Sequence, residues 1–197
     1  MAQQHSYDEE LPREGVPMSE EEFERLISGE TMHKYELING VLYDMTGSTP
    51  EHSSISGRID LLFQLQLGRS GPCRTHRDQY VAIPGNKPVC PDVVLTCDLG
   101  DWNKDQRAKP FRIQSPLIVV EVLSPGTEAY DRSDKFERYK QCRSFQVYIL
   151  VSQTEHLVEV FRLEKDWQKE TFTAGQIIQL GQLDLEFAVD EIYEGIL

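Results

Sequence analysis

The sequence lacks long hydrophobic runs. Its longest unbroken aliphatic stretch extends from Leu117 to Val120, where Glu121 ends it, whereas a membrane-spanning helix needs about 18 or more apolar residues. The first 30 residues carry nine acidic and two basic side chains, with no apolar segment of the kind found in secretory signals. We therefore expect no membrane partner and a cytoplasmic location.

Several chemical signatures are missing as well. The four cysteines form no CxxC or zinc-knuckle pair, which predicts reduced, buried thiols rather than a structural zinc site. The sequence has no GxSxG elbow of a serine hydrolase. Because it also has neither a Walker A loop nor a GxGxxG fingerprint, we expect no nucleotide cofactor.

The chain does contain enough apolar residues for a folded core. Of its 197 residues, 39% are hydrophobic and 27% are charged. The net charge of −13 is concentrated at the ends, because residues 1–30 net −7, residues 181–197 net −5 and residues 31–180 only −1. The overall charge therefore says little about what a central cleft binds. We expect residues 1–16 to form a flexible acidic tail and residues 17–197 a single domain.

Local patterns predict alternating helices and strands. Ser19 with Glu22 is a capping box that begins a short helix, and Asn39-Gly40 is a strong hairpin turn. The remaining segments predict helices over 51–67, 131–142 and near 189–193, strands over 75–83, 92–96, 117–123, 147–151 and 157–163, and a loop over 98–115. The expected class is mixed α/β (α+β), with a mostly buried central sheet flanked by helices and an N-terminal helix and hairpin.

Glu121 is the most informative residue, because it lies within an apolar strand. A carboxylate there costs several kcal/mol unless it is paired, hydrogen-bonded or bound to a metal. Asp92 begins another apolar strand, and antiparallel pairing of the two strands would bring both carboxylates to one end of the sheet. A hard divalent cation such as Mg²⁺ relieves the repulsion between them. Taken alone, each acid also has a structural interpretation, a satisfied core Glu and a turn Asp after Pro91.

A family resemblance adds to this interpretation. The motifs that carry it are Pro91-Asp92-Val-Val, Val120-Glu121-Val-Leu-Ser124-Pro125, Asp131-x3-Lys135-x3-Tyr139, Tyr35-Glu36-Leu-Ile-Asn-Gly40, His52 and Tyr148-Ile-Leu-Val151. As a set and in this order they resemble the PD-(D/E)xK nuclease superfamily, and more narrowly the bacterial Uma-type family of endonuclease-like proteins. The resemblance extends from residue 17 to residue 195.

The resemblance implies a restriction-endonuclease-like core and a catalytic set of Asp92, Glu121 and Lys135. The two acids would hold Mg²⁺ (or Mn²⁺), and the lysine would position the attacking water. The sequence departs from the superfamily pattern at Leu123, where the strand lysine is expected. In the Uma-type family the lysine is moved to the following helix, and Lys135 matches that position.

Other residues keep two interpretations each. Lys135 is either catalytic or a solvated charge on a surface helix. Glu36, His52 and Tyr139 are possible additional site residues, and each also has an ordinary structural role. Contacts to the nucleic-acid backbone are expected from Arg74, Arg77, Arg132 and Arg138.

Two functions follow from these expectations. The first is a Mg²⁺-dependent endonuclease that hydrolyses phosphodiester bonds, with nucleic acid, DNA ahead of RNA, as its partner and a homodimer as its active form. The second is an inactive protein of the same fold that serves as an interaction or nucleic-acid-binding module. The missing strand lysine and the acidic net charge favour the second, whereas the joint presence of Asp92, Glu121 and Lys135 favours the first.

Overall fold

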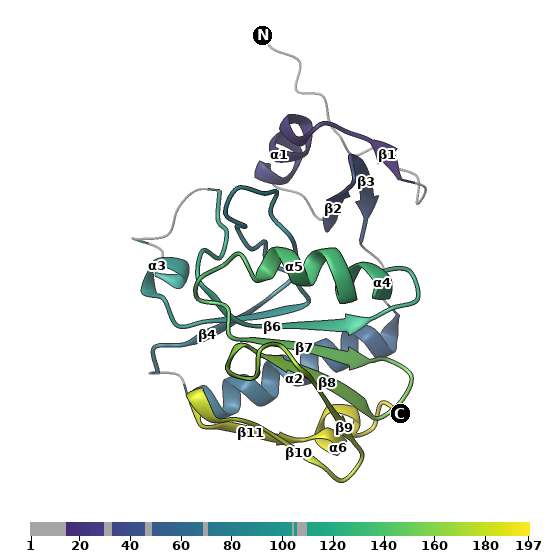
Figure 1. The fold of residues 1–197 in the computed structure, drawn as a ribbon, viewed down its shortest axis with the longest axis vertical. Helices are drawn as coiled ribbons and strands as arrows, with labels where there is room; N and C mark the ends of the chain where they lie inside the picture. The colour runs from purple at the N-terminus through teal and green to yellow at the C-terminus, as the bar shows by residue number, and fades with distance from the viewer. Residues whose placement is uncertain (1–14, 30–32, 46–48, 69–70, 104, 106–109) are drawn as a thin grey trace. The chain divides into compact units, whose positions relative to one another are not determined.

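The computed structural model describes residues 15–29, 33–45, 49–68, 71–103, 105 and 110–197 (Figure 1). Contacts divide the chain into two units, Met1–Ser48 and Thr49–Leu197, and each is described by itself. The boundary lies inside the range for which the sequence predicts one domain, so the single domain stays a prediction.

The first unit contains the predicted helix and hairpin. Its elements are β1 (Val16–Pro17), α1 (Glu20–Ser28), β2 (Tyr35–Ile38) and β3 (Val41–Asp44), with the strands in the order β1-β3-β2. The capping box forms as expected, since the Ser19 amide donates to the Glu22 carboxylate over 2.9 Å and the Glu22 amide donates to the Ser19 hydroxyl over 3.3 Å. Asn39 and Gly40 both adopt positive φ, 51° and 77°, which is the requirement of a two-residue hairpin turn.

The flexible tail predicted over residues 1–16 does not extend to its last residue, Val16. Val16 pairs with Leu42 on β3, so the chain is already part of a sheet at the end of the segment assigned to the tail. Residues 1–14 of that segment lie outside the described residues.

A six-stranded mixed sheet forms the centre of the second unit, in the order β4-β5-β6-β7-β8-β9. β6 and β7 pair in parallel, whereas the other neighbouring strands pair antiparallel. The strands are β4 (Arg74–Arg77), β5 (Val93–Thr96), β6 (Pro116–Leu123), β7 (Val147–Ser152), β8 (Leu157–Arg162) and β9 (Lys169–Thr173).

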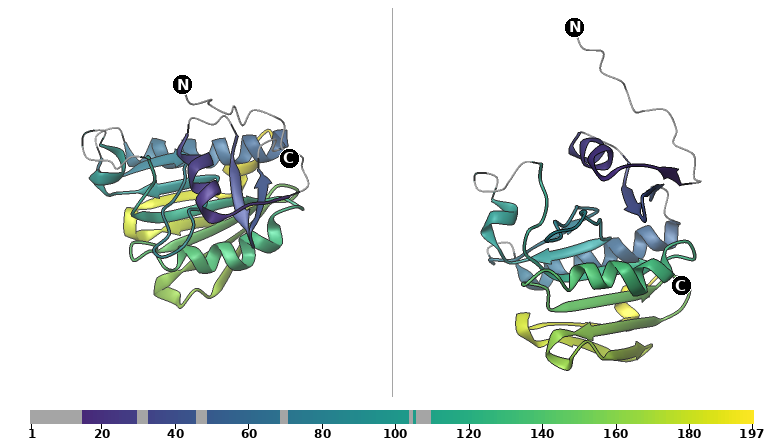
Figure 2. Two further views of the ribbon diagram at one scale, coloured as in Figure 1. Left: turned by 90° about the horizontal axis from the view of Figure 1, so that it is seen from above. Right: turned by 45° about the horizontal axis from the view of Figure 1, so that its top comes forward.

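Helices cover both faces of this sheet, as Figures 1 and 2 show. One face carries α2 (Pro50–Leu67), the hairpin of β10 (Ile177–Leu180) and β11 (Leu185–Ala188), and α6 (Val189–Tyr193). The opposite face carries a continuous helical segment made of α4 (Glu128–Tyr130), the π-helical turn η1 (Asp131–Lys135) and α5 (Phe136–Tyr139). The mixed α/β class with a flanked central sheet is therefore confirmed.

The central strand β6 explains why both faces are covered. Val120 and Val122 pack into the apolar cluster under α2, whereas Val119 and Leu123 pack into the cluster under α5. Because successive strand residues point to opposite faces, Glu121 points to the same face as Val119 and Leu123. The alternation thus directs this carboxylate toward η1 and α5.

Three predicted boundaries are wrong. The strand expected over 75–83 ends at Arg77 because Asp78 adopts a left-handed φ of 51°, which breaks the extended backbone. The loop expected over 98–115 contains α3 (Leu99–Trp102), whose first turn Asp98 caps by accepting from the Gly100 amide over 2.8 Å. The helix expected from Asp131 begins at Glu128. Two short 3-10 turns, η2 (Leu163–Lys165) and η3 (Gly181–Leu183), complete the unit.

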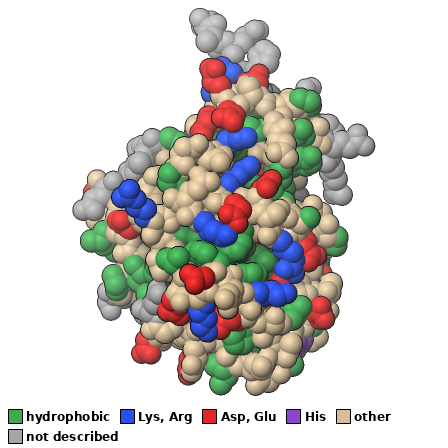
Figure 3. Space-filling model, viewed as in Figure 1, with side chains coloured by type: hydrophobic (Ala, Val, Ile, Leu, Met, Phe, Trp, Pro, Cys, Tyr) green, Lys and Arg blue, Asp and Glu red, His purple; other side chains and the backbone are tan. Residues whose placement is uncertain are grey.

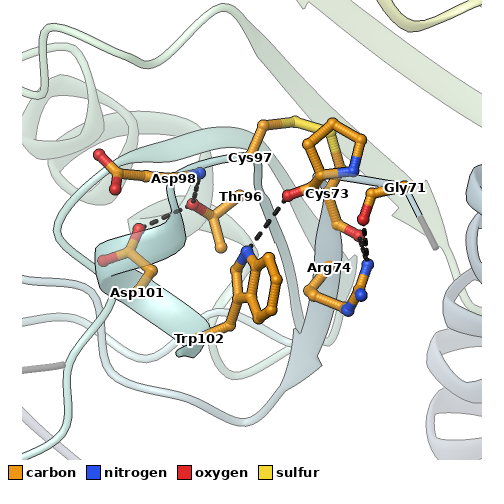
Figure 4. Close-up of a disulfide and its surroundings, with 9 residues drawn as sticks. Gly71, Cys73, Arg74, Thr96, Cys97, Asp98, Asp101 and Trp102 are labelled. Carbon is orange, nitrogen blue, oxygen red and sulfur yellow. Dashed lines mark hydrogen bonds between the residues drawn. A yellow bond between two sulfur atoms is a disulfide. The ribbon is translucent and has the colours of Figure 1, made fainter. Parts of the chain in front are cut away.

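The cysteines also differ from expectation, since Cys73 and Cys97 form a disulfide (Figure 4). Arg74 pairs with Thr96 across β4 and β5, so the next residues outward, Cys73 and Cys97, face each other with their Cα atoms 3.9 Å apart. Spacing along the sequence does not reveal a cross-strand register, which is why the prediction of four reduced thiols is wrong. Cys90 and Cys142 are free and buried.

Within the described part of the chain, no helix has both the length and the apolar character needed to cross a membrane.

Candidate active site

Two carboxylates meet at one end of the sheet, where β5 begins and β6 approaches its end. Val93 pairs with Val120 in the antiparallel register, so Asp92, one residue before Val93, lies opposite Glu121, one residue after Val120. Both side chains are buried, with exposed fractions of 6% for Asp92 and 2% for Glu121. The predicted pairing of the two strands therefore brings the two acids together.

Backbone amides connect the two acids reciprocally. The Val122 amide donates to Asp92 Oδ2 over 2.8 Å, and the Asp92 amide lies 3.4 Å from Glu121 Oε2 as donor. Hydrogen bonds of this kind favour the ionised form of a carboxylate. Each strand thus fixes the side chain of the other.

His52 approaches the site from the beginning of α2. Thr49 caps this helix by accepting from the His52 amide over 3.1 Å, and His52 Nε2 lies 3.2 Å from Asp92 Oδ2. The histidine therefore contacts one of the two acids, in the position of a side chain that orients it.

Lys135 reaches the site from the opposite face of the sheet. Its Nζ lies 2.9 Å from Glu121 Oε1 and 3.4 Å from Asp131 Oδ1, and donates to the Cys90 carbonyl over 3.2 Å. Only 2% of the residue is exposed, so Lys135 is not the solvated surface charge that the sequence left open.

The π-helical turn aligns three side chains on this face. In an α-helix four residues overshoot one full turn, since a turn takes 3.6 residues; in a π turn, with i→i+5 hydrogen bonds, they fall short of it. The angular displacement from Asp131 to Lys135 is therefore opposite to that from Lys135 to Tyr139. As a result, the three side chains lie on one face of η1 and α5. All three are buried.

Tyr139 and Asp131 complete the cluster. The Tyr139 hydroxyl donates to Glu121 Oε1 over 2.9 Å. Asp131 belongs to a motif that carries the family resemblance, but no role in the site is predicted for it. Its spacing of four from Lys135 was the signal that could have identified it. The Tyr148 hydroxyl donates to the Asp131 carbonyl over 2.9 Å and thereby holds the backbone of Asp131 in place.

Leu123 occupies the position of the expected strand lysine. It is buried in the apolar cluster with Val119, Tyr139 and Tyr148, so its side chain supplies no polar atom to the site. The amine that contacts Glu121 belongs instead to Lys135 of the helical segment.

Asp92 and Glu121 are the side chains of this site that could hold a metal ion. Within the described residues no group of three or more His, Cys, Asp or Glu side chains is arranged to hold a metal. Mg²⁺ commonly binds one or two carboxylates and completes its shell with water and substrate phosphate. The paired acids Asp92 and Glu121 are compatible with that mode of binding.

Glu36 is the one predicted site residue that belongs to the first unit. It lies on β2 and is 1% exposed. Its place in the site stays a prediction.

Two of the four arginines expected at the nucleic acid are bound to their own chain near the sheet edges. Arg132 forms ion pairs with Glu128 and Glu159. Arg74 donates to the carbonyls of Gly71 and Cys73 over 2.7 and 2.6 Å and stacks over Trp102 (Figure 4).

The other two arginines have no ion pair with the described residues. The Arg138 guanidinium lies 5.6 Å from the centre of the Tyr130 ring, and its buried Nη1 has no hydrogen-bond partner within the described residues. Arg77 donates from Nη2 to the Ser56 hydroxyl over 3.0 Å.

Comparison with known proteins identifies a matching family and two related proteins. The Uma2 family model, described as "Putative restriction endonuclease", matches residues 20–190. An uncharacterized protein of Synechocystis sp. (strain ATCC 27184 / PCC 6803 / Kazusa), slr1290, is 38% identical over 167 residues, covering 83% of this chain and 85% of its own. A second uncharacterized protein of that strain, sll1609, is 23% identical over 136 residues, covering 68% of this chain and 75% of its own.

A solved structure shares the fold. The crystal structure of a protein of Anabaena variabilis ATCC 29413, titled a "putative nuclease belonging to DUF820", superposes with a TM-score of 0.73 at 18% identity. The match covers 92% of this chain and 100% of the other.

Proposed function

The chain belongs to the Uma2 family of restriction-endonuclease-like proteins, and from this premise we propose that it is a metal-dependent nuclease that hydrolyses phosphodiester bonds of nucleic acid. The observation that carries the proposal is the contact of a buried lysine amine with Glu121, one of two buried carboxylates that lie next to each other. Lys135 Nζ lies 2.9 Å from Glu121, which in turn lies beside Asp92. Burying three ionisable groups together is costly, and hydrolysis of a phosphodiester gives each of them a task.

Asp92 and Glu121 would hold Mg²⁺ or Mn²⁺, which when bound supplies positive charge at the phosphate and makes a bound water more acidic. Lys135 would position the attacking water, because its amine lies beside Glu121, one of the two acids that would hold the metal. The same ammonium stabilises negative charge that develops on the phosphate. Tyr139 and His52 are positioning residues, each holding one carboxylate in place.

An inactive nuclease fold is the second candidate, and Leu123 favours it. Lys135 also contacts Asp131, so the lysine and the two acids could serve solely to attach the helical segment to the sheet. In this case the protein would be an interaction or nucleic-acid-binding module.

The two candidates are distinguished by a cleavage assay combined with calorimetry. Wild type, Glu121→Gln and Glu137→Gln are incubated with supercoiled plasmid DNA and with labelled RNA in Mg²⁺ or Mn²⁺, and Mn²⁺ is titrated calorimetrically into each protein. Glu137 is an exposed acid on α5, so its variant makes the same charge change away from the cluster. Far-UV circular dichroism verifies that all three are folded.

The nuclease proposal expects wild type and Glu137→Gln to cleave, and Glu121→Gln to lose at least about a hundredfold in rate. Mn²⁺ binding should weaken in Glu121→Gln alone. A wild-type protein that binds nucleic acid but cleaves neither substrate would support the inactive module instead.

The partner follows from the same proposal. We expect nucleic acid, with DNA ahead of RNA, and a homodimer, because cutting both strands of a duplex requires two centres and a symmetric pair of chains supplies them. The acidic net charge does not exclude a nucleic-acid partner, since Figure 3 shows basic side chains interspersed with acidic ones over the face drawn.

A further inference from the structure

Arg77 lies at the end of β4, and its guanidinium is fixed against α2. Nη2 donates to the Ser56 hydroxyl over 3.0 Å and to the Ser53 carbonyl over 3.5 Å. The residue is nevertheless exposed. An exposed arginine usually samples many rotamers, so these contacts keep the group in one place.

Gly57 of α2 lies directly against this guanidinium. A Cβ atom at this position would lie 3.3 Å from Arg77 Nη1, so a larger residue would require the guanidinium to shift. Glycine in a helix interior is less favourable than alanine, and α2 contains Gly57 in the middle of its 18 residues. The absence of a side chain at Gly57 thus allows the guanidinium to lie close to the helix.

Both attachments of Arg77 border the candidate active site. Ser53 follows His52, which contacts Asp92. On the other side, Arg77 pairs with Val93, the residue after Asp92, and the amide of Asp78 donates to the Asp92 carbonyl over 3.3 Å. A ligand bound at the guanidinium would therefore lie near the first turn of α2, where His52 contacts Asp92.

The charge of Arg77 is not neutralised by the described residues. No carboxylate among them lies within 4.0 Å of its guanidinium, in contrast to Arg132, which is paired with two acids. Its hydrogen bonds to described residues come from Nη2 alone, which leaves Nε and Nη1 as donors for a ligand. This planar fork of donors matches the oxygens of a phosphate group.

We propose that Arg77 binds a backbone phosphate of the nucleic-acid strand next to the phosphate at Asp92 and Glu121, and that Gly57 positions it for this contact. The inference rests on the proposed function. It assigns the strand a path across the end of β4 and the first turns of α2.

The test measures binding of a short fluorescein-labelled DNA, single-stranded and duplex, and of the equivalent RNA by fluorescence anisotropy at several salt concentrations. Ca²⁺ replaces Mg²⁺ so that cleavage does not interfere. The variant is Arg77→Gln, and the matched control is Arg143→Gln. Arg143 is exposed at the opposite end of the sheet, where the neighbouring Ser144 hydroxyl donates to the Pro116 carbonyl over 2.8 Å.

We expect Arg77→Gln to weaken binding by about tenfold and to reduce the slope of log K against log salt by about one. Arg143→Gln should leave that slope nearly unchanged. Gly57→Ala should weaken binding in the same direction while its unfolding midpoint stays equal or rises.

Equal affinities and salt slopes for Arg77→Gln and Arg143→Gln, with a wild type that binds, would overturn the phosphate contact and leave the nuclease proposal standing. A wild type that neither binds nor cleaves any of these nucleic acids would overturn both.

Discussion

At the scale of single residues, Lys135 depends on two acids for its burial. Its amine contacts Glu121 and Asp131 at 2.9 and 3.4 Å with only 3% of the side chain exposed. Removing the cation leaves two buried carboxylates without the positive charge that both of them contact. Such a charge is expensive in a protein interior.

Lys135→Met is therefore expected to lower the free energy of unfolding by about 3–5 kcal/mol. Adding Asp131→Asn to this variant should restore about 1 kcal/mol or more, because one of the two repelling charges disappears. Urea denaturation of the wild type, both single variants and the double variant measures the coupling. Purely additive losses would contradict the described contacts.

The cysteines give a second prediction at this scale. Burial raises the pKa of the Cys142 thiol to about 11, and Cys90 is buried as well. Since the thiolate is the reactive form, we expect the folded protein to react slowly with Ellman's reagent at pH 8. In guanidinium without reductant, two thiols should appear, because Cys73 and Cys97 form a disulfide. Four thiols would show that the bond does not form.

The sequence predicted part of the site, and the physical reason is clear. An acid within an apolar strand stands out against its neighbours, and strand alternation then gives its direction. The orientation of Lys135 was not accessible, because it depends on the π-helical turn, which no local pattern in 131–139 announces. Lys135 was predicted from the family resemblance, and its contacts are known only from the structure.

At the scale of elements, an ion-pair network connects the helical segment to the edge of the sheet. Arg132 from η1 and Lys169 from β9 both contact Glu159 on β8. Burial alone would raise the pKa of Glu159, but hydrogen bonds from Arg132 and Lys169 outweigh it and hold this pKa below its usual value of 4.5. Glu159 thus stabilises the fold only while it is ionised.

A lowered pKa gives a defined sign for the pH dependence. The contribution of Glu159 is complete above the pKa of the unfolded chain and disappears as the pH falls through the lower pKa of the folded state. We expect the wild type to lose stability below about pH 4.5, and Glu159→Gln to lose less over the same interval. At neutral pH the variant should be less stable by about 1–3 kcal/mol.

Urea titrations at several pH values measure this difference. Glu155→Gln, an exposed acid in the turn before β8, is the control and should follow the wild type. Parallel pH curves for wild type and Glu159→Gln would contradict the assigned role of the network.

Elements with strong local signals were predictable. The Asn39-Gly40 hairpin and the buried strand β6 have sequence patterns that few other structures satisfy. The shorter β4 was not predictable, since Val81 and Ile83 continue an apolar alternation beyond it. The left-handed conformation of Asp78 ends the strand in spite of that pattern.

At the scale of the whole molecule, both apolar clusters lie within Thr49–Leu197. The six-stranded sheet is complete there as well. A fragment of residues 49–197 is therefore expected to fold cooperatively. Its two tryptophans, Trp102 and Trp167, allow fluorescence and circular dichroism to be followed together in urea, and the two transitions should coincide. A fragment without a cooperative transition would show that the first unit is required for folding.

The parallel pairing of β6 with β7 has a consequence for how the protein is made. Parallel neighbours require a crossover connection, and here the crossover is the helical segment that carries Lys135 and Tyr139. During synthesis both acids leave the ribosome before this segment, and non-local pairing of this kind is slow. The lysine meets them only once the crossover has docked on the sheet. In a nascent chain the two acids are therefore present before Lys135 is in place beside Glu121, so the nuclease activity that we propose would arise only with the finished fold.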